Sequence, residues 1–318
     1  MKDMETVSRI PLLVILGPTA SGKTSLSLRL AHALNGEIIS ADSRQIYKEI
    51  DIGSDKIPME KREGIPHHLI DFVEPDQVYS MSEFKRDAER IIREIHARGH
   101  MPMLVGGTGL YIRAIVENFE LPDVPPQPEL RAKYNAILQE YGLEKGKEEL
   151  YKMLVELDPL AAEKIHRNNL PYVTRALEIA ETIGAKKEQK NESPYDVTMI
   201  GIKWPREQLW SRIDERVDLQ MQRGLLDEAK VLLEKYSTKL PSMTSLGAKE
   251  FEDYFAERST LEEVVQKLKF STRQYAKRQQ TWFKKDTQIR WIDGEVLARQ
   301  PEKVADEIIR DILAANTP

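Results

Sequence analysis

Residues 17–24 of the chain read GPTASGKT and match the pattern G-x-x-x-x-G-K-[ST] of a phosphate-binding loop. The glycines let backbone N–H groups surround phosphate oxygens, and a helix after the loop would point the positive end of its dipole at the same place. Lys23 supplies a positive charge, and the hydroxyl of Thr24 can ligate a magnesium ion. The stretch predicts a phosphate site, but kinases, ATPases, GTPases and some transferases all use this loop.

A carboxylate, Asp42, follows a second short apolar stretch at 37–41. Ligands of open parallel sheets bind beyond the carboxyl ends of the strands, so Asp42 is expected to face the same crevice as the phosphate loop. There it can accept a proton, hold a metal-bound water or cap the next helix. Its position beside the phosphate loop favours a role in chemistry.

Two other stretches could contribute to a site. The glycine-rich run 106–109 follows the apolar residues 101–105, and it permits either close approach of the backbone to a ligand or a tight turn from strand to helix. The adjacent His67 and His68 suggest a metal site. Because no third ligand follows at helical spacing, hydrogen bonding within a loop is the favoured interpretation of the two histidines.

The strongest charge feature is the segment 267–285, which holds seven basic residues and no acidic residue in a protein of net charge −5. Tyr275, Trp282 and Phe283 are interleaved with these charges. Basic and aromatic side chains on one helix are typical of nucleic-acid contact, which we favour over a merely solvated face.

Arg212 and Arg216 lie four residues apart on a predicted helix at 207–236 and therefore share a face. If that face is turned to the phosphate crevice, the two arginines can neutralise a diphosphate. Otherwise they would pair with Asp214 and Asp218 on the surface.

The pattern of apolar residues indicates the elements that position these groups. Strands are predicted at 11–16, 37–41, 101–105, 197–204 and 289–293, and helices at 25–34, 82–98, 207–236 with a possible break near Gly224, 267–285 and 302–314. Four prolines within 121–128 mark a boundary, and 129–184 is helical throughout. We predict an α/β fold: a P-loop parallel sheet flanked by helices, formed by 1–120 and 197–318, with an inserted all-helical domain at 121–196.

Composition narrows the class of protein. With 318 residues, of which 41% are hydrophobic, the chain can build a sizeable core. No apolar run approaches the roughly 20 residues of a membrane helix, and the N-terminus lacks the pattern of a signal peptide, so we expect a cytoplasmic protein without membrane association. The absence of cysteine excludes disulfides, thiolate metal sites and a cysteine nucleophile. We further expect a monomer.

Taken in order, the motifs resemble those of one family, the tRNA dimethylallyltransferases, also called tRNA isopentenyltransferases. The similarity extends from about Leu12 to Phe283. It is carried by the motifs GPTASGKT, ADSRQIYKEIDIGSDKIP, GIPHHLID, LVGGTGLY, RALE (Arg175 to Glu178) and TRQYAKRQQTWF. The resemblance implies transfer of a dimethylallyl group from dimethylallyl diphosphate to N6 of the adenosine 3′ of a tRNA anticodon, with release of diphosphate.

The resemblance also implies roles for individual residues. Asp42 would be the general base, and Lys23 and Arg216 would stabilise the leaving diphosphate. The diphosphate would be bound by Gly17, Pro18, Thr19, Ala20, Ser21, Gly22, Lys23 and Thr24, with Mg²⁺ held by Thr24. The helical insertion would grip the anticodon stem-loop. The expected tRNA contacts are Asp42, Ser43, Arg44, Gln45, Thr108, Arg131, Arg175, Arg278 and Gln279.

Two other classes of protein are considered. A nucleotide or small-molecule kinase would use the same loop and sheet, but the basic C-terminal helix argues against it. A non-catalytic RNA-binding protein with a vestigial nucleotide fold need not retain Lys23, Thr24 and Asp42 together, and this chain has all three.

Overall fold

The computed structural model describes residues 9–119, 121–122, 124–185, 192–244 and 247–315. The chain divides into two compact units, one of Met1–Asn118 with Glu192–Pro318 and one of Phe119–Asn191. The second unit begins two residues before the predicted insertion of 121–196 and ends five residues before its end. Within the predicted insertion, 186–191 lie outside the described residues.

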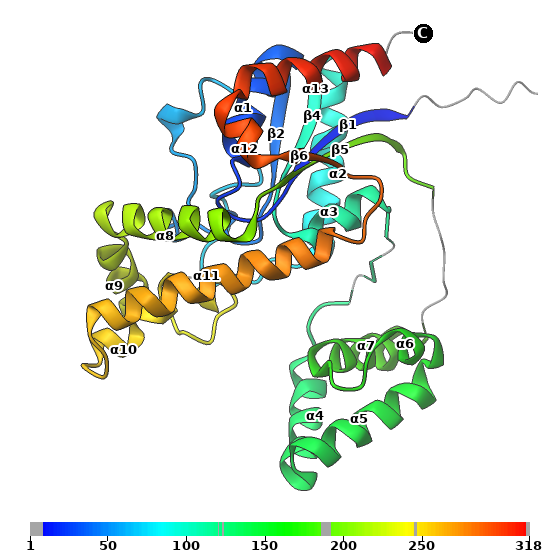
Figure 1. Ribbon diagram of the computed structural model, residues 1–318. Coiled ribbons are helices and arrows are strands. Elements are labelled where there is room, and N and C mark those ends of the chain that lie inside the picture. The colour runs from blue at the N-terminus through cyan, green and yellow to red at the C-terminus, as the bar shows by residue number, and fades with distance from the viewer. Residues whose placement is uncertain (1–8, 120, 123, 186–191, 245–246, 316–318) are drawn as a thin grey trace, which may run out of the picture. The chain divides into compact units, whose positions relative to one another are not determined.

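The first unit is built on a sheet whose described strands are all parallel, in the order β3-β2-β4-β1-β5-β6 (Figure 1). The strands are β1 (Ile10–Leu16), β2 (Gly36–Ala41), β3 (His67–His68), β4 (Met101–Gly106), β5 (Tyr195–Lys203) and β6 (Arg290–Asp293). The predicted α/β fold with a parallel sheet is confirmed. β5 begins two residues earlier than predicted, because Tyr195 and Asp196 already lie in register with Ile10 and Pro11 of β1.

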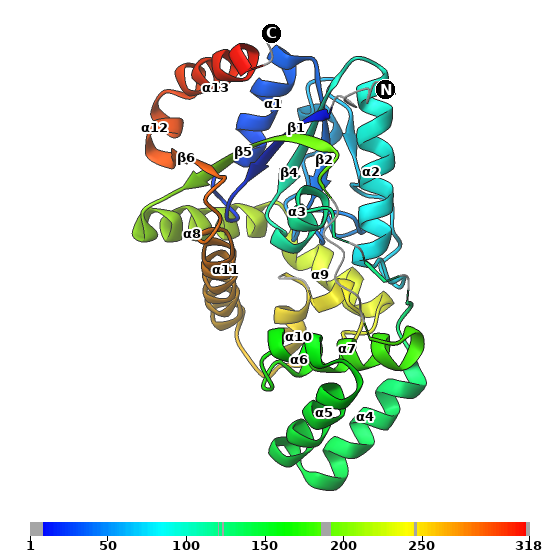
Figure 2. The same ribbon diagram turned by 90° about the vertical axis from the view of Figure 1, so that its right-hand side faces the viewer.

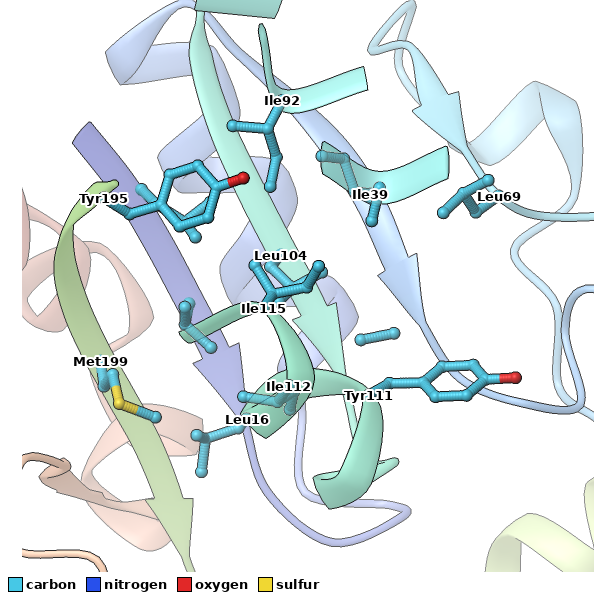
Figure 3. Close-up of a cluster of buried hydrophobic side chains, with 14 of the residues drawn as sticks. Leu16, Ile39, Leu69, Ile92, Leu104, Tyr111, Ile112, Ile115, Tyr195 and Met199 are labelled. Atoms are coloured by element: carbon cyan, nitrogen blue, oxygen red, sulfur yellow. The ribbon is translucent and has the colours of Figure 1, made fainter. Parts of the chain in front are cut away.

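Helices cover both faces of this sheet (Figure 2). Because side chains alternate along a strand, Leu13 and Ile15 of β1 pack on one face, whereas Leu12, Val14 and Leu16 pack on the other. The first face is covered by α1 (Lys23–Leu34), α12 (Gly294–Arg299) and α13 (Pro301–Ala315), and the second by α2 (Met81–Ala97) and α3 (Gly109–Val116). Figure 3 shows the apolar cluster on the second face, in which side chains of the central strands meet those of α2 and α3.

Further helices follow β5. The predicted break near Gly224 is confirmed, since that glycine has a φ of 98° and separates two helices. The elements are α8 (Arg206–Gln222), α9 (Leu225–Lys235), α10 (Glu252–Phe255) and α11 (Leu261–Phe283), with short 3₁₀ turns at Met59–Lys61, Ser242–Thr244 and Lys249–Phe251. Val217, Leu225 and Leu268 are buried in a core that these helices share with Ile46 and Ile50.

Helix α11 begins six residues before the basic segment that predicts it. The earlier start is explained by a capping box, in which the Thr260 hydroxyl accepts from the Glu263 N–H at 3.3 Å and the Glu263 carboxylate accepts from the Thr260 N–H at 2.8 Å. α11 packs against α8, which lies next to it in Figure 1.

The second unit is all-helical in its described part. Its helices are α4 (Pro128–Tyr141), α5 (Leu143–Leu157), α6 (Pro159–Lys164) and α7 (Leu170–Ile183). Tyr134, Leu150 and Leu177 lie at the centre of its own apolar core. Among the described helices of the whole chain, none combines the length and apolarity needed to cross a bilayer.

The paired histidines contribute to structure. His68, in edge strand β3, is hydrogen-bonded through Nε2 to Glu37 at 2.7 Å, and Glu37 also bonds Arg98 and His100. Burial of this carboxyl, which is 3% exposed, opposes its ionisation, but the hydrogen bonds from Arg98, His68 and His100 outweigh burial and hold the pKa of Glu37 at about 2. Both histidines are thus hydrogen-bonded, but only His67, whose Nδ1 bonds the Ile65 carbonyl at 2.8 Å, bonds within the local loop as predicted, whereas His68 bonds across to β2.

Glu37→Gln is expected to lower the free energy of unfolding by about 3 kcal/mol at pH 7, because the carboxylate is stabilised relative to an ordinary pKa of 4.5. Because the pKa of Glu37 is lower in the folded than in the unfolded protein, the carboxylate stabilises the fold at pH values above its unfolded-state pKa. This stabilisation is lost as the pH falls from about 4.5 to about 2. Denaturant unfolding at several pH values measures the free energy of unfolding of both proteins. Glu192→Gln, in an exposed pair with Arg9, is the control. Parallel stability curves for Glu37→Gln and the parent protein would contradict this account.

Candidate active site

The phosphate loop connects Leu16 at the end of β1 to Lys23 at the start of α1. Its backbone enters the left-handed region at Gly22, with a φ of 98°. Gly17 lies so close to β5 that a Cβ atom would be 3.0 Å from the carbonyl oxygen of Ile202. The glycines of the motif are thus required by the turn that brings the chain from a strand into a helix N-terminus, where backbone N–H groups bind anions.

Side chains from distant parts of the chain fix this loop. Trp204, just after β5, donates its indole N–H to the Ser21 carbonyl at 3.0 Å. Arg212 of α8 donates to the Ala20 carbonyl at 2.9 Å and stacks on the Trp204 ring at 4.3 Å. Side chains from other elements of the first unit therefore fix the loop. This pre-organises its N–H groups for an anion.

Gln279 of α11 is part of the same support. Its amide oxygen accepts from the Thr19 N–H at 2.8 Å, and its amide nitrogen donates to the Gly107 carbonyl at 3.0 Å. The side chain is buried, with 6% exposed. Both ends of its amide are thus bonded within the protein, and its predicted contact with tRNA stays a prediction. Gln279 links the phosphate loop to the turn after β4.

The loop opens into a cavity of about 300 Å³ at the carboxyl edge of the sheet. Residues from β1–α1, the end of β2, α8 and α11 meet there, as expected for strands that end at one edge of a parallel sheet. Its lining includes Thr19, Lys23, Thr24, Asp42, Arg216 and Tyr275. The three residues that the resemblance assigns to catalysis, Lys23, Asp42 and Arg216, therefore line one cavity.

Arg212 and Arg216 are turned toward the phosphate loop. Arg216 donates from Nη1 to the Thr19 hydroxyl at 2.7 Å. Asp214 and Asp218 face the other way, toward α11, where they bond Arg273 and Lys269. Of the two alternatives drawn from the sequence, the one that places both arginines at the phosphate crevice agrees with the structure.

Lys23 lies at the start of α1 with its ammonium group bonded to the Pro18 carbonyl at 2.7 Å. Burial lowers the pKa of this ammonium group from 10.5 to about 8; nearby Asp42 acts in the opposite direction and nearby Arg216 lowers the pKa further. Lys23 is still largely charged at neutral pH, and a bound diphosphate would reinforce its protonated form.

The affinity of the protein for inorganic pyrophosphate is expected to fall as the pH rises through about 8, because the free protein then loses the Lys23 charge that attracts the anion. Titration calorimetry between pH 7 and pH 9 in magnesium measures the effect. Lys23→Met is the control, since ionisation of the ligand itself affects both proteins equally. The same pH dependence in both proteins would contradict the assignment.

Asp42 follows β2 in a tight turn, where one carboxylate oxygen accepts from the Arg44 N–H at 2.9 Å. The Thr108 hydroxyl accepts from the Ser43 N–H at 3.0 Å, and the Thr108 N–H donates to the Ala41 carbonyl at 3.1 Å. The turns after β2 and β4 thus fix each other beside the cavity. The structure gives Asp42 and Thr108 defined positions, whereas their contact with tRNA stays a prediction.

The glycines after β4 allow close packing within the protein. A Cβ on Gly106 would lie 2.2 Å from the Ala41 carbonyl oxygen, and one on Gly107 would lie 2.1 Å from the Gln279 amide nitrogen. Of the two explanations considered for this run, a tight turn from strand to helix is the one that fits these contacts. Gly106 also lines the cavity.

Arg44 and Gln45 bond to neighbouring loops. Arg44 donates to the Pro241 carbonyl and, at 3.1 Å, to the Thr244 hydroxyl. Gln45 donates to the carbonyls of Ser54 and Asp55, both at 3.3 Å. Both side chains line the cavity, and their predicted contact with tRNA is not tested by these bonds.

In unit two, Arg131 and Arg175 share one partner. Both donate to the carboxylate of Glu178, which is fully buried, and Arg175 also donates to the Val124 carbonyl at 2.6 Å. Removal of either arginine would leave a buried charge with fewer partners. The two arginines therefore have a structural role in this unit, and their predicted contact with tRNA stays a prediction.

The basic segment on α11 is partly neutralised. Lys267 pairs with Asp253, Lys269 with Asp218 and Arg273 with Asp214. The side chains of Lys277 and Arg278 are exposed further along the helix. Nucleic-acid contact by this segment is therefore expected at its C-terminal half, which includes Arg278.

The cavity suits a magnesium ion that arrives with phosphate. Thr24 and Asp42 both line it and carry oxygen ligands, which Mg²⁺ prefers. Among the described residues, no three His, Cys, Asp or Glu side chains are grouped as a cage. Mg²⁺ usually takes one or two ligands from a protein and the others from water and phosphate, so Thr24 is a suitable ligand.

Sequence reasoning did not assign a role in the site to Asp55, Gln220 or Trp204. Asp55 lies within a quoted motif, but its pairing with Arg216 at 3.3 Å joins residues far apart in the chain. Gln220 is buried in α8 and looks like any polar residue of an amphipathic helix. Only a three-dimensional arrangement reveals these partners.

Comparison with known proteins identifies the family of the chain. A family described as IPP transferase matches residues 45–286, and one described as isopentenyl transferase matches residues 10–71. The chain belongs to the IPP transferase family.

Named relatives cover nearly the whole chain. A tRNA dimethylallyltransferase of Bacillus thuringiensis is 45% identical over 298 residues, which is 92% of each chain. The crystal structure of a tRNA isopentenylpyrophosphate transferase from Bacillus halodurans is 41% identical, covers 96% of each chain and has a TM-score of 0.72. A eukaryotic dimethylallyltransferase, whose structures are described as snapshots of the enzyme acting on tRNA, is 32% identical with a TM-score of 0.82, over 98% of this chain and 81% of that one.

Proposed function

We propose that the protein transfers a dimethylallyl group from dimethylallyl diphosphate to N6 of the adenosine 3′ of a tRNA anticodon. One observation carries this proposal: Asp42 lines the same cavity as Lys23 and Arg216. A base and a set of cations around one space suit a reaction in which an amine loses a proton while a diphosphate leaves.

In this reaction the N6 nitrogen forms a bond to C1 of the allylic group. The bond between C1 and the diphosphate oxygen breaks, and its electron pair leaves with the diphosphate. Lys23, the loop N–H groups and Arg216 stabilise the charge that develops on that oxygen. Thr24 would hold Mg²⁺ together with the diphosphate, and the ion would supply additional positive charge when bound.

Asp42 takes the proton that the attacking amine releases. The exocyclic amine of adenine is hardly basic, so proton removal has to accompany its attack on carbon. The turn after β2 holds the carboxylate through the Arg44 N–H and so limits its motion. A base fixed in position is effective because it needs no reorganisation during the reaction.

A target adenosine in the anticodon loop has to leave its stack to reach the cavity. Bases of single-stranded loops can be splayed out at low cost, which suits this substrate. We propose that the anticodon stem-loop contacts the helical unit through Arg131 and Arg175 and contacts α11 through Arg278. The protein would act as a monomer in the cytoplasm, where tRNA is available.

The test uses magnesium, unmodified tRNA and dimethylallyl diphosphate labelled in the allyl group. The proposal predicts label in tRNA that requires Lys23 and no consumption of ATP. A nucleotide kinase would consume ATP and leave tRNA unlabelled, and family membership does not favour that alternative. Absence of label in tRNA together with ATP turnover would reject the proposed function.

A further inference from the structure

Asp55 is an acidic residue in the wall of the cavity, beside the cations that face the phosphate loop. Its carboxylate pairs with Nη1 of Arg216 at 3.3 Å and with Nη1 of Arg223 at 3.3 Å. The same Nη1 of Arg216 donates to the Thr19 hydroxyl of the loop at 2.7 Å. One guanidinium therefore contacts the phosphate loop and a carboxylate at once.

The loop that carries Asp55 is tied down along its backbone. The carboxylate of Glu228 accepts from the N–H groups of residues 51, 52 and 53 at 3.0, 2.7 and 2.8 Å. Gln220 donates to the Ile52 carbonyl at 2.6 Å, and Gln45 donates to the carbonyls of Ser54 and Asp55. Such a set of bonds holds Asp55 in place, so its pairing with Arg216 is not that of two mobile surface chains.

Asp55 has a left-handed backbone with a φ of 52°. Among residues other than glycine, Asp and Asn adopt this conformation most readily. The position therefore accepts Asn without a change of backbone. The charge of Asp55 can thus be removed without a change of the fold.

A diphosphate on the phosphate loop would approach the guanidinium of Arg216, because Arg216 contacts Thr19 of that loop. Asp55 would then lie close to the bound anion and would share its cation. Two negative charges near one cation compete for it and repel each other, most strongly where water is partly excluded.

We infer that Asp55 is the counter-ion of Arg216 and that it competes with diphosphate for this guanidinium, so that it limits the affinity of the site for diphosphate and the product leaves. The inference rests on the proposed function. The group that Asp55 opposes is the diphosphate, either as part of the substrate or as the released product.

The test is the affinity of the full-length protein for inorganic pyrophosphate in excess magnesium, measured by titration calorimetry. Asp55→Asn is expected to bind pyrophosphate about tenfold more tightly and to turn over more slowly, because the product is retained. Asp55→Glu keeps the charge and is expected to stay within about threefold of the parent protein. Asp311→Asn, in an exposed pair with Arg290 on another part of unit one, is the control for the loss of one surface charge.

A merely structural role for Asp55 would weaken pyrophosphate binding when Asn replaces it, since Arg216 would be less well placed. Equal or weaker binding by Asp55→Asn, with the parent protein binding normally, overturns the inference and leaves the proposed function intact. Failure of the parent protein to bind pyrophosphate overturns both, because the loop would then not be a diphosphate site.

Discussion

Asp42→Ala is expected to lower the rate of dimethylallyl transfer at saturating substrates by about 10³-fold, the range lost when a positioned general base is removed. The carboxylate lies at the end of β2 and lines the cavity together with Lys23 and Arg216. Its loss leaves the attacking amine without an acceptor for its proton. Single-turnover measurements with labelled dimethylallyl diphosphate report the chemical step without product release.

The affinity for tRNA distinguishes a general base from a substrate-binding residue at position 42. Asp42→Ala is expected to bind tRNA within about threefold of the parent protein, because the tRNA contacts proposed for the helical unit and α11 are unchanged. Asp42→Asn keeps the shape of the side chain and should be equally slow. A variant that binds tRNA far more weakly but turns over normally at saturation would show that Asp42 binds substrate and is not the base.

The second large effect is expected for Lys23→Met. Removing one pre-organised cation from the position of a developing negative charge costs about 3 to 4 kcal/mol of barrier, which is a few hundredfold in rate. We expect that loss in kcat/KM for dimethylallyl diphosphate. The affinity for tRNA is expected to be unaffected, because Lys23 is bonded within the phosphate loop.

Lys303→Met on α13 is the matched control for loss of a lysine, since its side chain is exposed on the far side of the sheet from α2. It should leave kcat/KM unchanged. Pyrophosphate inhibition of Lys23→Met should weaken in parallel with its activity. Unaltered inhibition by pyrophosphate would mean that the Lys23 charge does not act on the diphosphate.

Local patterns were sufficient for much of the fold. The buried runs that form β1, β2 and β4 and the loop at 17–24 depend on neighbouring residues, and each lies within two residues of its predicted place. The break at Gly224 could be predicted for the same reason, because a glycine with positive φ ends a helix locally. β3 could not be found, since two residues are too few to show a pattern.

The partners of charged and polar side chains could not be predicted from the sequence. Gln279 bonds a residue 260 positions away in the phosphate loop, so its role as a support could not be read from its helix. Lys269 and Arg273 form part of a basic stripe in sequence, yet α8 supplies a carboxylate to each. Arg131 and Arg175 were expected to contact tRNA, but nothing local in the sequence predicts that both bond the buried Glu178.

Under the proposed function, the phosphate loop holds a leaving group. Kinases use such a loop to activate phosphorus, whereas the present account makes phosphorus a spectator and places bond formation at carbon. That distinction determines which products appear and in what ratio.

The most direct test is the product ratio of one reaction with unmodified tRNA and dimethylallyl diphosphate. We predict one diphosphate released for each dimethylallyl group transferred, with the group found on N6 of the adenosine 3′ of the anticodon after nuclease digestion and mass spectrometry. Release of single phosphate, or a modified nucleoside that carries phosphate in place of the allyl group, would contradict the account.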